Sequence, residues 1–330
     1  MRYFLRRIGF FLATLWAAVT LNFIIPRLQP GDPAEIMYKK LAGKDAELDP
    51  AKIQALRVML GDPAGASIWD QYWNYFGALG RGEFGVSYTY FPYDVTAVIG
   101  KALPWTVILV GITLILSFLI GTVLGAFAAW RRNSRFDSVV TLGSTFIGTL
   151  PAFWLALLIL FLLGYVLGWF PTSGGYDSSM PGWNLDFIAD AAYHSFLPAA
   201  VLMIVGPIGW ILGMRNTMIM NLGEDYVRLA RAKGVPDRQI ALRYAARNAL
   251  LPSVTGLALA LGSLLGGQIL IEQVFDYPGV GRLMGQAISN KDYPLLQALL
   301  LFTIVGVLLA NLIADMIYGI LDPRARKASS

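Results

Sequence analysis

The sequence predicts an all-α polytopic membrane protein with six transmembrane helices, and three observations support this fold class. Of the 330 residues, 56% are hydrophobic and only 14% are charged, and the mean hydropathy is +0.57. Apolar segments long enough to cross a bilayer alternate with polar loops. The basic residues, which give a net charge of +5, gather in short loops between those segments. That distribution is typical of a membrane protein and does not indicate binding to nucleic acid.

Composition also excludes several kinds of functional site. The chain has no cysteine, so it has no disulfide and no thiolate site, and its single histidine, His194, cannot form a multi-histidine metal site. Neither Gly43-Lys44 nor Gly100-Lys101 is followed by Ser or Thr, so a Walker A motif is absent. We therefore expect no catalytic residues, no cofactor, no metal and no ATP hydrolysis by the chain itself.

Residues 1–26 are predicted to form a cytoplasmic N-terminus and the first span. Residues 8–26 carry no charge and, at ~1.5 Å per residue, are long enough to cross the bilayer. Arg2, Arg6 and Arg7 precede them, and basic residues beside a span favour the cytoplasmic side. No cleavage site of the Ala-x-Ala kind clearly follows, so we expect this segment to remain as an anchor.

Residues 27–101 are predicted to form an extracytoplasmic subdomain, because their charges nearly balance and the segment is long enough to fold on itself. Asp49 is expected to cap a helix that begins at Pro50. The apolar face of this helix would comprise Ile53, Leu56, Met59 and Leu60. A second stripe comprises Trp69, Tyr72, Trp73 and Phe76. It suits packing at the lipid head groups or contact with a partner, and the first is the simpler interpretation.

Residues 102–321 are predicted to form a five-helix core. The spans would cover residues 102–130, 139–166, 195–214, 250–271 and 293–320. Gly121 with Gly125, and Gly262 with Gly266, have the four-residue spacing that favours close helix packing. Pro151 predicts a kink within the third of the six spans.

The basic loops set the expected orientation. Cytoplasmic loops are indicated by Arg131, Arg132 and Arg135, by residues 215–247, and by Arg324, Arg326 and Lys327 in the tail. Residues 168–194 contain no Lys or Arg and are expected outside, together with residues 272–292. Both termini, including the tail at residues 322–330, are therefore predicted to be cytoplasmic.

Asp315 is the clearest charge within a predicted span. A buried acid in a membrane helix suggests function, but Asp315 is close enough to the inner end to be a hydrated or paired residue, and its role stays open. A proton-coupled carrier would show more buried carboxylates, and six spans are few for a carrier built from repeats in one chain. The sequence therefore favours a pore-forming half that depends on partners, with an autonomous channel or secondary carrier as the alternative.

The chain is organised around a polar stretch at residues 224–252, which lies between two strongly apolar segments and overlaps the predicted cytoplasmic coupling loop at residues 215–250. Asp225 is expected to cap a short helix over residues 226–233, Gly234 supplies a left-handed stop, and Pro236 prevents continuation. A second helix is predicted over residues 237–248. A short helix at a membrane surface suits docking by a soluble partner, although a basic loop that only fixes topology remains the alternative.

Motifs throughout the chain carry a resemblance to a known family. Residues 225–234 have the sequence Asp-Tyr-Val-Arg-Leu-Ala-Arg-Ala-Lys-Gly, and residues 247–252 have Arg-Asn-Ala-Leu-Leu-Pro. Further matches lie at residues 30–33, 84–87, 153–155, 167–171, 277–281 and 322–324. Together they resemble the first permease subunit of bacterial dipeptide/oligopeptide-type ABC importers. Arg228-Leu229-Ala230 stands where the general importer pattern has Glu-Ala-Ala, and the proline comes late, at Pro252, as in the peptide-type subfamily.

The resemblance implies a type I ABC importer permease in the bacterial plasma membrane. Its partners would be a second homologous permease subunit, two ATP-binding subunits that hydrolyse ATP, and an extracytoplasmic solute-binding protein. Peptides would be the cargo, with oligosaccharides, nickel complexes or other small solutes as alternatives, and the substrate-pathway residues are not identified.

The resemblance also implies a helix that couples the permease to an ATPase. It would comprise Glu224, Asp225, Tyr226, Arg228, Leu229, Ala230, Arg231, Ala232, Lys233 and Gly234. Leu229 and Ala230 would enter a groove on the ATPase. The basic residues Arg228, Arg231 and Lys233 would contact its acidic rims.

Overall fold

The computed structural model describes residues 2–28, 33–43, 49–59, 67–177 and 184–321. Within these ranges the chain is helical and has no β-strand, and an isolated bridge pairs Val86 with Asp94. The predicted all-α class is therefore confirmed. The matches predicted at residues 30–32 and 322–324, the side chains of Met59 and Asp315, Leu60, and the tail at residues 322–330 lie outside what is described.

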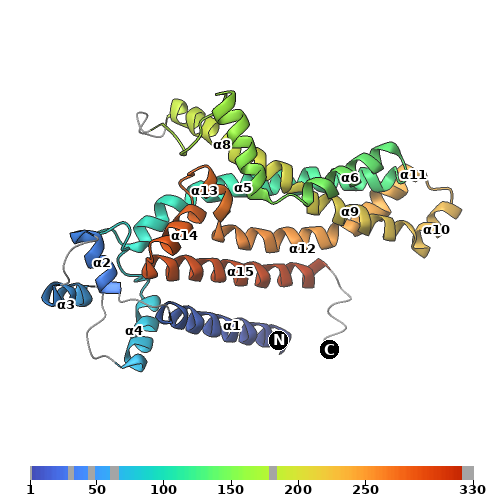
Figure 1. Cartoon of the computed structure of the whole chain (residues 1–330). Helices are drawn as coiled ribbons and strands as arrows, with labels where there is room; N and C mark the ends of the chain where they lie inside the picture. The colour runs from blue at the N-terminus through green and yellow to red at the C-terminus, as the bar shows by residue number, and fades with distance from the viewer. Residues whose placement is uncertain (1, 29–32, 44–48, 60–66, 178–183, 322–330) are drawn as a thin grey trace.

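Helices make up most of the described residues. Their bounds are α1 (Arg2–Arg27), α2 (Pro33–Ala42), α3 (Pro50–Met59), α4 (Ile68–Gly80), α5 (Val95–Trp130), α6 (Arg135–Gly148), α7 (Ala152–Ile159), the π-helix η1 (Leu160–Val166), α8 (Leu185–Val205), α9 (Pro207–Leu222), α10 (Asp225–Ala232), α11 (Asp237–Gln239), the π-helix η2 (Ile240–Ala246), α12 (Arg247–Ser263), the 3-10 helix η3 (Leu264–Gly266), α13 (Ile269–Val274), α14 (Val280–Ser289) and α15 (Tyr293–Leu321). Figure 1 shows the long helices side by side, with α2–α4 at one end and α10 and α11 at the other.

Only some of the six predicted spans are formed by helices that are long and apolar enough to cross a membrane. Among the described residues, 4 segments are long and apolar enough to cross a membrane: Ile8–Ile25, Val95–Trp130, Leu185–Leu222 and Tyr293–Ile313. A fifth would be the bent pair of α6 with α7 and η1. The predicted fifth span contains α12, which has 17 residues and continues only through the three residues of η3. It ends before Gly267, whose φ of +68° breaks the helix, and not at residue 271 as expected.

Two further boundaries differ from the prediction. The second span begins at Val95 and not at residue 102, and the fourth runs over Leu185–Leu222, well beyond residues 195–214. In both cases the helix continues past the segment that hydropathy marks, through residues 95–101 in the second span and through residues 185–194 and 215–222 in the fourth. Hydropathy marks only the apolar middle of such a helix.

Pro151 breaks the third predicted span and does not merely kink it. The helices before and after it are bent by 92°. Pro151 has an extended backbone, with ψ of 129°, and stands immediately before α7. Proline lacks a backbone N–H and its ring obstructs the preceding turn, which explains the interruption.

The glycine pairs lie where helices meet closely, as predicted. A Cβ atom on Gly121 of α5 would lie 2.5 Å from Cβ of Trp210 and 2.8 Å from the carbonyl oxygen of Pro207, both on α9 or at its start. One on Gly125 would strike the carbonyl oxygen of Ile211. On α12, a Cβ atom on Gly262 would lie 2.9 Å from the carbonyl oxygen of Gly306 on α15. Any larger residue would therefore force these helices apart.

Within its described residues, the region predicted to form an outer subdomain contains α2, α3 and α4 and the first turns of α5. The carboxylate of Asp49 accepts a hydrogen bond from the backbone N–H of Ala51 at 3.0 Å, so the predicted cap of α3 is confirmed. From the expected apolar face, Ile53 is buried against Ala34 and Tyr38 of α2. Residues 33–42 and 50–59 thus fold against each other.

The aromatic stripe on α4 has two different surroundings. Tyr72 is buried, and its ring meets that of Phe23 of α1 edge-on with centroids 5.3 Å apart. Trp69 and Trp73 are exposed. The stripe therefore fixes α4 to the first span through one face and leaves two tryptophans outward, which suits the head-group interface.

Candidate functional site

The short helix in the central polar loop forms as α10, with a start one residue from the prediction. Glu224 has the extended backbone of an N-cap, with φ of −71° and ψ of 153°, and its side chain makes no capping hydrogen bond. Asp225 is already helical, so the expectation that it caps the helix is wrong. In the first turn its carboxylate still favours the positive end of the helix and pairs with Arg228 at 3.4 Å.

The glycine stop at the end of α10 is confirmed. Gly234 has φ of +77°, the left-handed region that favours glycine. Its N–H donates to the carbonyl of Arg231 at 2.9 Å, and the N–H of Val235 donates back to the carbonyl of Ala230 at 3.1 Å. These bonds satisfy the last carbonyls of the helix and fix the direction in which the chain leaves it.

The second predicted helix, over residues 237–248, does not end where expected. α11, the π-helix η2 and α12 follow without a gap, and Pro252 lies inside α12. The second half of the loop is therefore the start of the next long helix, which continues through α12. Likewise α9 extends to Leu222, so the polar segment between the helices is shorter than residues 215–250.

One face of α10 is buried within the protein, and Ala230 lies on that face. Val227 is fully buried and Ala230 is only 5% exposed, and both pack against Ile240 of η2. Residues three apart share a helix face, so Leu229 points elsewhere and is 57% exposed. Leu229 is thus the apolar residue available to a partner, whereas Ala230 cannot enter a groove without detaching α10 from η2.

The exposed face of α10 combines that leucine with positive charge. Besides Leu229, eight residues of the predicted coupling helix are exposed. Three are basic and two, at the start of the helix, are acidic; the eight are Glu224, Asp225, Tyr226, Arg228, Arg231, Ala232, Lys233 and Gly234. Tyr226 is at the margin of this face, and its hydroxyl accepts a hydrogen bond from Nδ2 of Asn248 at 3.1 Å. This face lies at the end of the molecule opposite to α2–α4 (Figure 1), and its chemistry suits an acidic, grooved protein surface.

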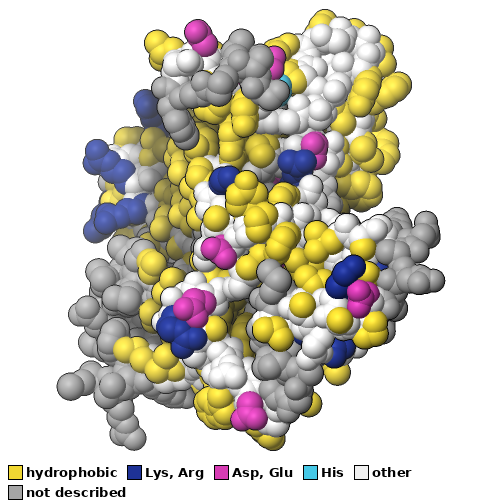
Figure 2. Space-filling view, turned by 90° about the vertical axis from the view of Figure 1, so that its left-hand side faces the viewer, with side chains coloured by type: hydrophobic (Ala, Val, Ile, Leu, Met, Phe, Trp, Pro, Cys, Tyr) yellow, Lys and Arg dark blue, Asp and Glu magenta, His cyan; other side chains and the backbone are white. Residues whose placement is uncertain are grey.

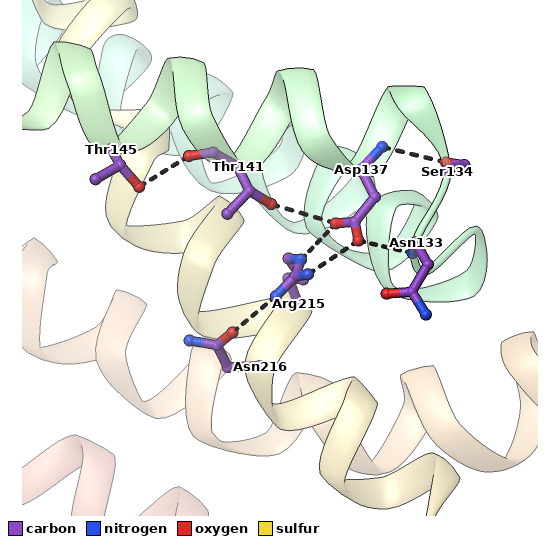
Figure 3. A network of polar contacts seen from close by, with 7 residues as sticks. All are labelled: Asn133, Ser134, Asp137, Thr141, Thr145, Arg215 and Asn216. Atoms are coloured by element: carbon purple, nitrogen blue, oxygen red, sulfur yellow. Dashed lines mark hydrogen bonds and ion pairs between the residues drawn. The ribbon is translucent and has the colours of Figure 1, made fainter.

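A buried ion pair close to this end was not found from the sequence. Asp137 of α6 accepts hydrogen bonds from Nε and Nη2 of Arg215 on α9, at 2.5 and 2.9 Å (Figure 3). Asp137 also accepts from the backbone N–H of Asn133 at 3.0 Å and from the hydroxyl of Thr141 at 3.2 Å. The side chains of Asp137 and Arg215 are only 4% and 20% exposed. The pair ties α6 to α9 about two turns before the end of α9 at Leu222.

A weak sequence signal for that pair exists. Ser134 accepts a hydrogen bond from the backbone N–H of Asp137 at 3.2 Å, so the Ser-x-x-Asp spacing marks the start of α6. In the sequence, Arg215 is one of several basic residues in the predicted cytoplasmic loop, and no local pattern marks it as the partner of an acid. Only the packing of α6 beside α9 brings the two side chains together.

Comparison with known proteins identifies relatives along the whole chain. Residues 121–327 match the family described as binding-protein-dependent transport system inner membrane component. The chain is 34% identical over 324 residues to the oligopeptide transport system permease protein AppB of Bacillus subtilis, covering 98% of both. It is 34% identical over 338 residues to the di/tripeptide transport system permease protein DppB of Pseudomonas aeruginosa, covering 97% of both. Identity to the dipeptide transport system permease protein DppB of Escherichia coli is 33% over 355 residues, covering 99% of both.

Proposed function

The chain belongs to the family of binding-protein-dependent transport system inner membrane components, and we propose that it is one permease half of an ATP-driven importer of peptides. The observation that carries the proposal is the similarity to relatives named as peptide permeases over nearly the full length. The chain is a multi-pass membrane protein of the type I importer permease fold. Its named relatives are permeases, which suits a chain that moves solute and leaves ATP hydrolysis to other subunits.

The proposed partners are a second, homologous permease subunit, two ATP-binding subunits and an extracytoplasmic solute-binding protein. The exposed face of α10 supports contact with an ATP-binding subunit, because Leu229 can fill an apolar groove while Arg228 and Arg231 meet acidic rims. The buried face of α10 packs against Ile240 of η2. A displacement of α10 would therefore be passed to η2, which continues into α12, and to α9 through Leu222, which packs against the same cluster.

Reconstitution in liposomes tests the proposal. The chain with its three kinds of partner should accumulate radiolabelled trialanine when ATP is supplied, whereas the chain alone should not. The chain has no nucleotide-binding motif of the Walker A type, so ATP hydrolysis in this assay would come from the ATP-binding subunits. Uptake by the chain alone would instead favour an autonomous channel or carrier. Uptake of an oligosaccharide or a nickel complex, but not of trialanine, by the whole complex would contradict the peptide assignment.

We propose that the α10 end is cytoplasmic, with both termini on that side, and that residues 27–101 lie outside. The basic residues of α10 and of the N-terminus support this orientation. Alkaline phosphatase fused after Gly175 should be active, since that enzyme matures only outside the cytoplasm, whereas green fluorescent protein fused after Gly234 should fluoresce. The reverse pattern would invert the topology and place α10 out of reach of an ATP-binding subunit.

A further inference from the structure

A cavity of about 350 Å³ lies at the end of the molecule opposite to α10. Four separate segments line it: residues 90–93, the first turns of α5, Tyr176 in the connection before α8, and residues 278–283 at the start of α14. Among the described residues that line it, two are cations, Lys101 and Arg282, and none is acidic. Figure 2 shows this end of the molecule, where charged side chains are scattered over a largely hydrophobic and uncharged surface.

The cavity has rigid aromatic walls. Trp105 of α5 stacks on Tyr176, with ring centroids 5.6 Å apart and planes within 8° of parallel. Tyr90 and Tyr93 supply two further rings. Burial raises the pKa of Tyr90, so its hydroxyl stays neutral and donates a hydrogen bond to Gln286. Stacked and hydrogen-bonded rings keep their positions, so the cavity is formed before any ligand arrives.

The remaining wall, residues 278–283, is held by a buried carboxylate. Glu272 is fully buried and accepts hydrogen bonds from the hydroxyl of Thr106 at 2.9 Å and from the backbone N–H of Gly281 at 2.7 Å. Thr106 in turn accepts from the N–H of Val280 at 2.7 Å. These bonds join the start of α14 to α5 and so fix Arg282 opposite Lys101.

The two cations have different surroundings. Nε of Arg282 lies 2.6 Å from Oδ1 of Asp276, which orients the guanidinium and offsets its charge. Lys101 forms no ion pair with any described residue, and its Nζ lies 5.1 Å from the centroid of the Tyr93 ring. The cavity therefore offers one uncompensated positive charge, a second set of N–H donors and aromatic surface, which suits an anion attached to an apolar body.

We propose that this cavity receives the free carboxylate end of a transported peptide. Lys101 would pair with the carboxylate, while Trp105 and Tyr176 would contact the adjoining side chain. A single uncompensated charge matches a carboxylate better than a doubly charged phosphate, and about 350 Å³ holds one or two residues. This assignment rests on the proposed function, which supplies peptides as the cargo.

Charged thiol reagents test the site directly, because the chain has no cysteine of its own. Ala97 is exposed and lines the cavity one turn before Lys101, whereas Thr96, the exposed neighbour on α5, does not line it. In the assembled transporter, A97C and T96C are each modified with an anionic sulfonate and a cationic trimethylammonium methanethiosulfonate. We expect the ratio of the anionic to the cationic modification rate to be roughly fivefold higher at A97C than at T96C. Adding Lys101→Gln to A97C should lower that ratio by about the same factor. Lys101→Arg should keep it.

Peptide protection forms the second arm of the experiment. The peptide Ala-Ala-Phe with a free carboxylate should slow modification of A97C, whereas the same peptide with a C-terminal amide should not. Equal protection by both peptides, or equal rate ratios at A97C and T96C, would overturn the proposal. Protection by the solute-binding protein without peptide would also overturn it, because a partner would then fill the cavity. The reagent rates need no transport, so a failure of peptide uptake, which concerns the proposed function, is seen separately.

Discussion

Leu229→Asp is expected to abolish peptide uptake and substrate-stimulated ATP hydrolysis while the chain remains in the membrane. Leu229 is the most exposed large apolar side chain of α10, at 57%, compared with 37% for Tyr226. Truncating a hot-spot side chain at the centre of an interface costs about 2 kcal/mol or more, roughly a thirtyfold loss of affinity, and we expect Leu229 to be such a residue. A carboxylate placed in an apolar groove adds a desolvation cost. Co-purification of the ATP-binding subunits and uptake in liposomes measure the effect.

Leu242→Asp is the matched control. Leu242 is similarly exposed, at 53%, but lies on η2 and outside α10. It should bind the ATP-binding subunits and transport as the unmodified chain does. Normal transport by Leu229→Asp would show that α10 does not transmit force and that the loop only fixes topology. Ala230→Trp would be a poor test, because Ala230 is packed on Ile240 and its enlargement would detach α10 whatever binds outside.

Asp137→Ala is expected to lower the free energy of unfolding by about 3 kcal/mol, the cost of breaking a buried pair by removing one partner. Arg215, with 20% of its side chain exposed, would be left without its carboxylate, and the backbone N–H of Asn133 would lose its acceptor. The midpoint of thermal unfolding in detergent should fall by several degrees. Asp137→Leu combined with Arg215→Met should recover most of the loss, since an apolar pair leaves no unpaired charge.

Glu83→Ala provides the matched control for this loss. Glu83 pairs with Nε of Arg81 at 2.9 Å, but both side chains are more than half exposed, at 61% and 63%. Exposed pairs contribute about 0–1 kcal/mol, so the midpoint should hardly move. Equal midpoints for Asp137→Ala and Glu83→Ala would show that the buried Asp137 pair contributes no more to the free energy of unfolding than the exposed Glu83 pair does.

Local chemistry predicted some features of the fold well and could not predict others. The glycine stop at Gly234 and the cap at Asp49 depend on neighbouring residues alone, and both are confirmed. The inward face of Ala230 depends on Ile240, which packs against α10 only once the chain has turned. Asp137 and Arg215 are 78 positions apart, so no window of sequence contains both.

The positions at which helices break or continue were a second feature that the sequence predicted poorly. Pro151 indicates that a helix cannot continue regularly through this position. The size of the bend, 92°, also depends on how α7 packs beside α8. Conversely, Asn248 was expected to end a helix, and η2 instead runs directly into α12. A π-helix widens the turn without any residue that marks it, so its continuation was not visible in the sequence.

The glycines between α5 and α9 restrict how this protein can change shape. At Gly121 and Gly125 the two helices approach so closely that a methyl group would meet Trp210 or the backbone of Ile211. Sliding one helix along the other by a single residue would bring a side chain into the place of each glycine. The register of the two helices is therefore fixed, and α5 and α9 have to tilt together as one rigid body whenever the transporter opens or closes.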